Sequence, residues 1–387
     1  MKTRVALAKC STYRPEEITA ALEKLFVSLG GPQQFIPPGA LVLIKPNLLT
    51  DRAPEKAVTT HPEIVRALIK TVRRCGGTPL VGDSPAGVMK MDSVLEKTGF
   101  RALCDEEKVK FVVFEKESCI AHDYQGVPLA IARTACDADL VINVPKLKTH
   151  AFTLFTNAAK NLFGLLPGFQ KTMLHKTFPN PRQFGDCLAF LYGLVRPGLT
   201  VCDAVIGMEG DGPSAGTPLQ LGFMAASTDG VALDTAFCKM LNINVKDVFY
   251  LDSLRRAGSG ETDPENIDLI GDTRDLGRIP PIKLPASAKA ARFIPRRLVR
   301  LAEPYLWVRP VFTENCTACG RCVRACPVGA LALNQPDKTG RIDGTRPRLD
   351  RKKCIGCCCC HEVCPERAIK MMRSPLFALL SPQKSKK

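Results

Sequence analysis

The chain lacks any apolar run of the roughly 18 residues that a membrane-spanning helix needs. Its first ten residues, MKTRVALAKC, contain no apolar leader with a cleavage site and read at once as a strand. Both absences favour a cytoplasmic protein. In that compartment thiols stay reduced, so we expect clustered cysteines to bind metal rather than to form disulfides.

Aromatic residues and familiar catalytic signatures are also scarce. A single tryptophan and 30 prolines do not favour the stacked aromatic platform of a nucleic-acid binder. The chain contains no G-x-x-x-x-G-K-[ST], no G-x-G-x-x-G and no H-E-x-x-H. No sequence signal therefore points to a P-loop NTPase, a dinucleotide-binding enzyme or a zinc protease.

Paired cysteines are missing from the first 280 residues. None of the eight cysteines there forms a C-x-x-C pair, so we interpret most of them as small buried hydrophobic residues. The other ten cysteines all lie between residues 316 and 364. That segment repeats itself after 38 residues: CTACGRCVRACP (316–327) aligns with CIGCCCCHEVCP (354–365).

Both halves of the repeat have the spacing C-x2-C-x2-C-x3-C-P of bacterial two-cluster [4Fe–4S] ferredoxins. Three cysteines at two-residue gaps wrap three corners of an iron–sulfur cube, and the fourth faces away to complete the other cube. A zinc ribbon would leave the third and fourth cysteines unexplained. We assign to cluster I Cys316, Cys319, Cys322 and Cys364, and to cluster II Cys354, Cys357, Cys360 and Cys326. Residues 307–375 resemble this ferredoxin family.

Two cysteines in the second half are extra. Cys358 aligns with Gly320, and Cys359 with Arg321. Glycine serves at the first position to allow a backbone conformation that side chains resist. We interpret both cysteines as bystanders, with spare ligands or redox-sensitive thiols as alternatives. His361 is expected to face solvent, because the cysteines already complete both ligand sets.

Positive charge is concentrated at the end of the chain. From residue 281 onward, 22 basic residues face 7 acidic ones, a net charge of +15, whereas the first 280 residues hold 32 basic and 31 acidic side chains. A basic surface steers an acidic redox partner protein toward it. A nucleic acid or an anionic membrane surface is the less favoured partner. Its contact would be the segment 291–310, which we otherwise interpret as a linker packed on the body.

Strand-like and helix-like patterns alternate in the first 280 residues. Such alternation predicts an α/β domain with a mainly parallel sheet and flanking helices, joined here to a small α+β ferredoxin-like two-cluster domain. The predicted strands include 4–9, 40–47 and 137–146, and the predicted helices 15–29, 60–74, 91–107, 153–166, 181–195 and 230–241.

Ligands of such sheets gather beyond the carboxyl ends of the strands. Three lysines at predicted strand ends, with glycine-rich loops nearby, favour a crevice for a small anion; polar turn residues without a function are the alternative. The candidate binding residues are Lys45, Asp83, Lys146, Lys148 and His150. Asn157, Lys160 and Asn161 share one face of the predicted helix 153–166, lining either the same crevice or its wet side.

Six motifs occur together in this part of the chain: KPN (45–47), THPEIV (60–65), GDSP (82–85), INVPKLKTH (142–150), TNAAKNLFG (156–164) and MEGDGPSAGTP (208–218). In this order they resemble the family named domain of unknown function 362, over about residues 4–275. Members of that family often carry a ferredoxin tail. The resemblance implies a fold and a redox context but no particular reaction.

These patterns predict four segments: an α/β domain (1–280), a basic linker (281–306), a two-[4Fe–4S] domain (307–375, repeats about 307–336 and 345–374) and a basic tail (376–387). Low-potential electron transfer through two [4Fe–4S] clusters is the favoured function. The alternatives are a redox enzyme whose α/β domain binds a small anionic substrate or cofactor, and a nucleic-acid or membrane-surface binder with structural clusters.

Overall fold

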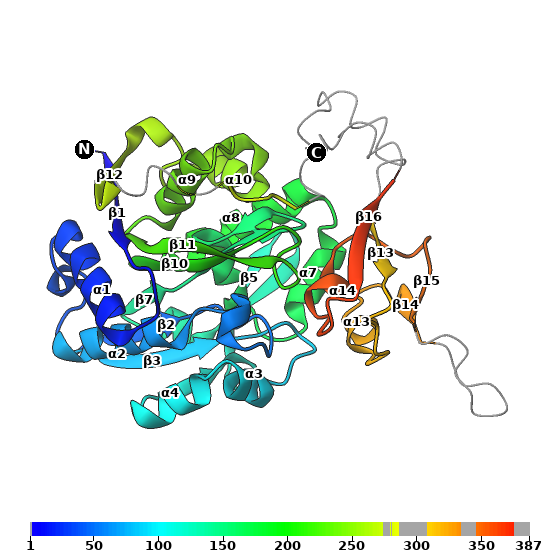
Figure 1. Ribbon diagram of the computed structural model, residues 1–387, viewed down its shortest axis with the longest axis horizontal. Helices are drawn as coiled ribbons and strands as arrows, with labels where there is room; N and C mark the ends of the chain where they lie inside the picture. The colour runs from blue at the N-terminus through cyan, green and yellow to red at the C-terminus, as the bar shows by residue number, and fades with distance from the viewer. Residues whose placement is uncertain (1, 274–278, 280, 286–307, 334–345, 375–387) are drawn as a thin grey trace.

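The computed structural model of the chain describes residues 2–273, 279, 281–285, 308–333 and 346–374 (Figure 1). Most of the predicted linker, the segment 291–307, part of the insertion between the two cysteine repeats and the tail 376–387 lie outside the described residues. The predicted segment boundaries therefore stay predictions.

A mainly parallel sheet forms the centre of the body. Its strand order is β12-β1-β11-β10-β7-β2-β3-β4, and β8 and β9 extend it from β10. Parallel pairs join β7, β2, β3 and β4, whereas β11 is antiparallel to both of its neighbours. The strands of this sheet are β1 (Thr3–Lys9), β2 (Leu41–Lys45), β3 (Thr78–Asp83), β4 (Phe111–Val113), β7 (Leu140–Asn143), β8 (Lys146–His150), β9 (Leu154–Thr156), β10 (Leu199–Glu209), β11 (Thr217–Ser227) and β12 (Ile267–Gly271).

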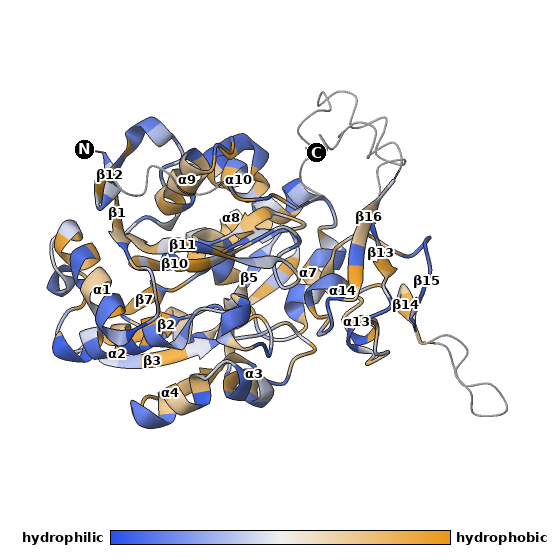
Figure 2. Cartoon of the chain, in the orientation of Figure 1, coloured by the Kyte–Doolittle hydropathy of each residue, from blue (hydrophilic) through white to orange (hydrophobic). Residues whose placement is uncertain are grey.

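Helices cover both faces of the sheet (Figure 1). One hydrophobic core lies under α1 (Pro15–Leu29), α2 (Pro62–Arg74), α3 (Met91–Lys97) and α4 (Phe100–Glu106). The other lies under α6 (Ala158–Asn161), α7 (Gln170–Thr177), α8 (Pro181–Val195), α9 (Gly230–Met240) and α10 (Phe249–Ala257). Hydrophobic residues follow the strands and the helix sides that face them (Figure 2). The predicted α/β fold is confirmed.

The smaller elements complete the described chain. In the body, β5 (Cys119–Tyr124) and β6 (Val127–Ala132) form a separate hairpin, followed by α5 (Arg133–Asp137). The tail is a small α+β unit in which β13 pairs with β16 and β14 with β15. Its elements are β13 (Val308–Phe312), α13 (Arg321–Arg324), β14 (Leu331–Ala332), β15 (Arg348–Leu349), α14 (Cys359–Glu362) and β16 (Ile369–Arg373). Within the described residues, no helix is both long and apolar enough to span a membrane.

Three predicted elements are wrong in detail. The predicted helix 91–107 is interrupted at Gly99, whose φ of 78° ends one helix and starts the next. The predicted strand 137–146 is divided at Pro145, which has no N–H to donate to the sheet. Most of the predicted helix 153–166 is not an α-helix, because its first residues turn back and pair with β8 in the register Lys148↔Thr156. Only Ala158–Asn161 is α-helical there.

Candidate functional site

Two cavities in the tail are lined by the predicted ligand cysteines. Three cysteines of the first triplet and the distant Cys364 line one cavity of about 320 Å³: Cys316, Cys319, Cys322 and Cys364. Three cysteines of the second triplet and the distant Cys326 line the other, of about 330 Å³: Cys354, Cys357, Cys360 and Cys326. Each cavity thus combines the three regularly spaced thiols of one repeat with the fourth thiol of the other, and Cys358 also lines the second cavity.

The local backbone fits both cavities to thiolate ligands. In each repeat the fourth cysteine accepts a backbone hydrogen bond from the residue four positions later: Ala330 N–H to Cys326 Sγ at 3.1 Å, and Ala368 N–H to Cys364 Sγ at 3.3 Å. Amide donors of this kind stabilise charge on a ligating sulfur. Among the described residues no three His, Cys, Asp or Glu side chains converge on a single ion. The thiols of a cube each bind a separate iron, so they stand farther apart than the ligands of one ion.

The two extra cysteines face different sites. Cys358 lines the cavity of the second triplet and has a φ of 65°, in the left-handed region where Gly320 of the first repeat has a φ of 71°. The glycine-like backbone expected at this position is therefore present, although a side chain occupies it. Cys359 does not line that cavity but a larger pocket between the tail and the body. His361 is 1% exposed, so the expectation that it faces solvent is wrong.

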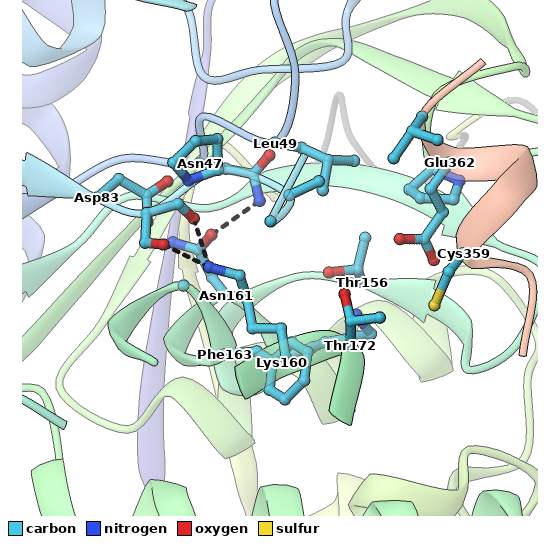
Figure 3. Close-up of a pocket in the computed structure, with 18 of the residues that line it drawn as sticks. Asn47, Leu49, Asp83, Thr156, Lys160, Asn161, Phe163, Thr172, Cys359 and Glu362 are labelled. Carbon is cyan, nitrogen blue, oxygen red and sulfur yellow. Dashed lines mark hydrogen bonds between the residues drawn. The ribbon is translucent and has the colours of Figure 1, made fainter. Parts of the chain in front are cut away.

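The larger pocket, about 760 Å³ of empty space partly open to solvent, lies beyond the carboxyl ends of β2 and β3 (Figure 3). Lys45 ends β2, Asp83 ends β3, and Lys148 and His150 come from β8. Helices α6 and α7 contribute further polar residues, and the tail closes the opposite side with Cys359 and Glu362 of α14. Four of the five candidate binding residues thus line one pocket.

Lys146 is the candidate that lies elsewhere. Its ammonium donates to Asp203 Oδ2 at 2.8 Å and to the Tyr13 hydroxyl at 2.7 Å, both outside the pocket. The register between β8 and β10 shifts between the pairs Lys146–Asp203 and Met208–Lys148. This irregularity sends two lysines that are two residues apart into different environments.

At one end of the pocket a buried ion pair is fully bonded. Lys45 Nζ donates to Asp83 Oδ1 at 2.7 Å and to the carbonyl of Pro46 at 2.8 Å, and Leu48 N–H donates to Asp83 Oδ2 at 2.6 Å. Burial lowers the pKa of Lys45 and raises that of Asp83, so each group needs the other to stay charged. A Cβ on Gly164 would lie 2.3 Å from Asp83 Oδ1, which is why this close approach requires glycine.

Asparagines extend this bonded end of the pocket (Figure 3). Asn47 Nδ2 donates to Asn161 Oδ1 at 2.9 Å, and Asn161 Nδ2 donates to Asn143 Oδ1 at 2.8 Å. Lys148 Nζ donates to Asn47 Oδ1 at 2.9 Å and to the Val58 carbonyl. Burial, with a further effect of the charge on Lys160, lowers the pKa of Lys148 to about 7.

A histidine connects the body to the tail across the pocket. His150 Nδ1 accepts backbone hydrogen bonds from Phe152 and Thr153, so the proton of the neutral ring lies on Nε2. That atom is 3.3 Å from Glu362 Oε1. Burial, then the charge of Lys160, lowers the pKa of His150 to about 3 and keeps the ring neutral. Burial alone would favour the neutral acid of Glu362, but the close approach of His150 Nε2 and the charge of Lys160 lower its pKa to about 2.

Further contacts dock the tail on the body. Arg321 donates to both carboxylate oxygens of Asp51, at 2.8 and 3.2 Å, and Lys97 donates to the same group at 3.1 Å. Burial favours the neutral acid of Asp51, but these hydrogen bonds outweigh it and lower its pKa to about 2. Arg52 donates to the backbone carbonyl of Cys364, and the hydroxyl of Ser214 donates to that of Glu362.

Ser214 belongs to a stretch, Gly212-Pro-Ser-Ala-Gly216, that matches the letters of the nucleophile motif G-x-S-x-G. In hydrolases that motif joins a strand to a helix. Here it joins β10 to β11, two antiparallel strands, and the serine hydroxyl bonds the tail. The structural context therefore does not support a hydrolase.

Replacing Asp51 with asparagine is expected to weaken docking by about 1–3 kcal/mol, because the amide keeps the size of the side chain but loses the charge that faces Arg321 and Lys97. Thermal unfolding of the anaerobic, iron-loaded protein would then show the visible absorption of the tail lost before the far-UV signal of the body. Asp92→Asn is the control, since Asp92 is 84% exposed and, among the described residues, pairs only with Arg101. Transitions that coincide in Asp51→Asn as they do in Asp92→Asn would contradict the importance of this contact.

Comparison with known proteins gives two family matches. Residues 42–239 match the family described as Domain of unknown function (DUF362), and residues 315–368 match a 4Fe-4S dicluster domain. A thylakoid-associated protein of Synechocystis sp. is 34% identical over 277 residues, which are 71% of this chain and 86% of that protein. The indolepyruvate oxidoreductase subunit IorA of Archaeoglobus fulgidus is 41% identical over 64 residues, 16% of this chain and 8% of that subunit.

Among solved structures, the lactate racemase apoprotein from Thermoanaerobacterium thermosaccharolyticum aligns with a TM-score of 0.42 and 15% sequence identity. The alignment covers 63% of this chain and 58% of that chain.

Proposed function

Since the chain belongs to the DUF362 family and carries a 4Fe-4S dicluster domain, it is an iron–sulfur protein of electron transfer, and we propose that it passes single electrons through two [4Fe–4S] clusters with crossed ligand sets. The observation that carries the proposal is the composition of the two thiol cavities: each is lined by the three regularly spaced cysteines of one repeat and by the fourth cysteine of the other, with Cys358 as an additional residue in the second. Shared ligand segments place two clusters close enough for electrons to pass between them.

The residues of the chain hold and tune these clusters. Eight thiolates supply the ligands, and the backbone N–H groups of Ala330 and Ala368 stabilise charge on two of them. Bound clusters accept and release one electron each. Cys319 is exposed, whereas Cys357 and Cys360 are buried. Cys322 and Cys364 of the first cavity are buried as well, so the proposed contact for an external partner is Cys319, the one exposed residue among the eight assigned ligands.

Anaerobic reconstitution with iron and sulfide tests the number of clusters. We expect about eight irons and about eight inorganic sulfides per chain, with the EPR spectrum of two interacting reduced [4Fe–4S] clusters. An iron content near four would leave one cluster, and one zinc without iron or sulfide would contradict the proposal entirely. Reduction of an artificial acceptor without any added metabolite would support a carrier.

A redox enzyme is the second candidate, favoured by the position of the larger pocket. The pocket is walled by the body on one side and by α14 on the other, and α14 contains Cys360 and ends two residues before Cys364. A small anion bound there would lie against the segment that holds both ligand sets. Acceptor turnover that requires an added small anion, and that falls when Lys148 is replaced by methionine at unchanged iron content, would distinguish this enzyme from a carrier.

For the partner we propose an acidic redox protein, supported by the net charge of +15 from residue 281 onward. The alternative is an anionic membrane surface, and the name of the thylakoid-associated relative is its support. The cytoplasmic location predicted above stays a proposal. Binding to anionic liposomes that is lost at high salt would favour the membrane surface as the partner. Salt-dependent binding to a column that carries an acidic ferredoxin, without binding to liposomes, would favour the redox protein.

A further inference from the structure

Polar groups without partners gather at the end of the larger pocket nearest the tail. The Lys160 ammonium lies 5.4 Å from the centre of the Phe163 ring, and it makes no hydrogen bond or ion pair within the described residues. The buried Nδ1 of His175 also lacks a partner among the residues described. The hydroxyls of Thr156 and Thr172 line the same end and make no hydrogen bond to any described residue. Figure 3 shows the drawn hydrogen bonds at the opposite end, around Asp83, Asn47 and Asn161.

The other lysines of the pocket are already bonded. Lys45 pairs with Asp83, and Lys148 has two oxygen acceptors. Lys171 donates to the hydroxyl and the carbonyl of Ser84 and to the carbonyl of Leu166. Lys160 is therefore the lysine whose hydrogen-bonding capacity is left for a ligand.

The charged side chains of the pocket also favour an anion, because the basic ones outnumber the acidic ones. Four lysines line it, of which Lys148, with a pKa lowered to about 7, is only partly charged at neutral pH, against the two carboxylates of Asp83 and Glu362. Burial lowers the pKa of His150 to about 3 and that of His175 to about 4, so neither ring adds to the charge. Burial lowers the pKa of Lys160 although the charge of Glu362 raises it, so the cost of removing this ammonium from water is only partly offset. A bound anion would offset that cost.

We propose that this end of the pocket binds a small organic carboxylate, whose carboxylate oxygens accept from Lys160 and from the hydroxyls of Thr156 and Thr172. This proposal rests on the second proposed function, the redox enzyme, and specifies the chemical class of the small anion that such an enzyme would bind. A single free ammonium with two hydroxyls matches one carboxylate, and no arginine fork of the kind that favours phosphate lines the described pocket. Leu49, Phe163 and Val363 offer apolar surface to the carbon part.

The bound carboxylate has a consequence that the clusters can report. Cys359 and Glu362 of α14 line the pocket, and Cys360 of the same helix lines the cavity of the second triplet. A negative charge next to this helix disfavours adding an electron to the neighbouring cluster. Ligand binding is therefore expected to lower a cluster midpoint potential, a readout that does not require turnover.

Titration calorimetry of the anaerobic, full-length, iron-loaded chain with acetate, malonate and inorganic phosphate tests the proposal. We expect a carboxylate to bind, and Lys160→Met to weaken that binding about 10- to 100-fold, since a hydrogen bond to a charged group is worth about 1.5–3 kcal/mol. Lys176→Met is the matched control, because Lys176 is exposed on α7 and does not line the pocket. Lys160→Arg and Thr172→Val keep the test available if the methionine variant loses its iron.

Each outcome decides the matter. Binding of phosphate but of neither carboxylate would overturn the ligand class, and equal loss in Lys176→Met would overturn the site. Failure of all three probes to bind a chain with about eight irons would also overturn the site but would leave the two-cluster proposal intact. A chain that takes up no iron on anaerobic reconstitution, but still binds a carboxylate through Lys160, would instead uphold the site and refute the cluster proposal.

Discussion

Replacing Cys364 with serine is expected to halve the iron content, from about eight to about four per chain, by removing the cluster of the distant first triplet. Cys364 lies in the second repeat, yet it lines the cavity of Cys316, Cys319 and Cys322. A serine hydroxyl is a poor substitute for a thiolate ligand, and three ligands hold a cube weakly. Iron and sulfide analysis with EPR measures the loss.

Double variants reveal which cluster each cysteine serves. If the ligands are crossed, Cys316→Ser and Cys364→Ser remove the same cluster, so the chain with both changes keeps about four irons. The chain with Cys354→Ser and Cys364→Ser then keeps none, because each change removes a different cluster. If the ligands were not crossed, these two results would be exchanged. Cys136→Ser, which changes an exposed cysteine of the body, is the control and should retain about eight irons.

Replacing Lys45 with methionine is expected to destabilise the body by about 3–5 kcal/mol, because it leaves the carboxylate of Asp83 buried without its counter-charge. The side chains of Lys45 and Asp83 are 0% and 3% exposed, and their atoms are 2.7 Å apart. Chemical unfolding followed by far-UV circular dichroism measures the change. A loss below about 1 kcal/mol would show that Asp83 is neutral or otherwise compensated in the folded chain.

Two further variants separate the buried charge from the loss of packing. Lys45→Met combined with Asp83→Leu removes both charges, and most of the lost stability should return, since replacing a whole buried pair by apolar groups is often neutral. Lys24→Met is the surface control. Lys24 is 63% exposed in its pair with Asp272, so its replacement should cost no more than about 1 kcal/mol.

The tail was the part of the molecule most accessible to prediction, because its candidate ligands are recognised by the local spacing of the cysteines. The same eight cysteines that the repeat singles out are found around the two cavities. Cys358, which departs from the aligned Gly320, nevertheless has the same left-handed backbone. The alternation of strands and helices predicted the α/β body for a similar reason. The helices that join parallel strands cover both faces of the sheet, so strands and helices alternate along the sequence.

Long-range packing was not accessible in this way. Nothing near residue 361 signals that the helix carrying it docks against the body, so the burial of His361 and the position of Glu362 in the pocket were missed. The separation of Lys146 from Lys148 depends on a register shift against β10, for which no sequence pattern exists. The β8–β9 hairpin was missed because the intervening residues lack the Asn-Gly or Asp-Gly signal of a tight turn. Lys160 had been singled out, although on a longer helix than the structure contains.

Two of the docking bonds end on main-chain oxygens rather than on side chains. Arg52 and Ser214 of the body donate to the carbonyls of Cys364 and Glu362, atoms that a residue of any type at those positions would present. Mutational drift at Glu362 therefore leaves the Ser214 bond in place, even where it abolishes the contact with His150. A ferredoxin module recombined onto this body would bring both carbonyl acceptors to the donors Arg52 and Ser214, provided that its second half follows the same backbone path.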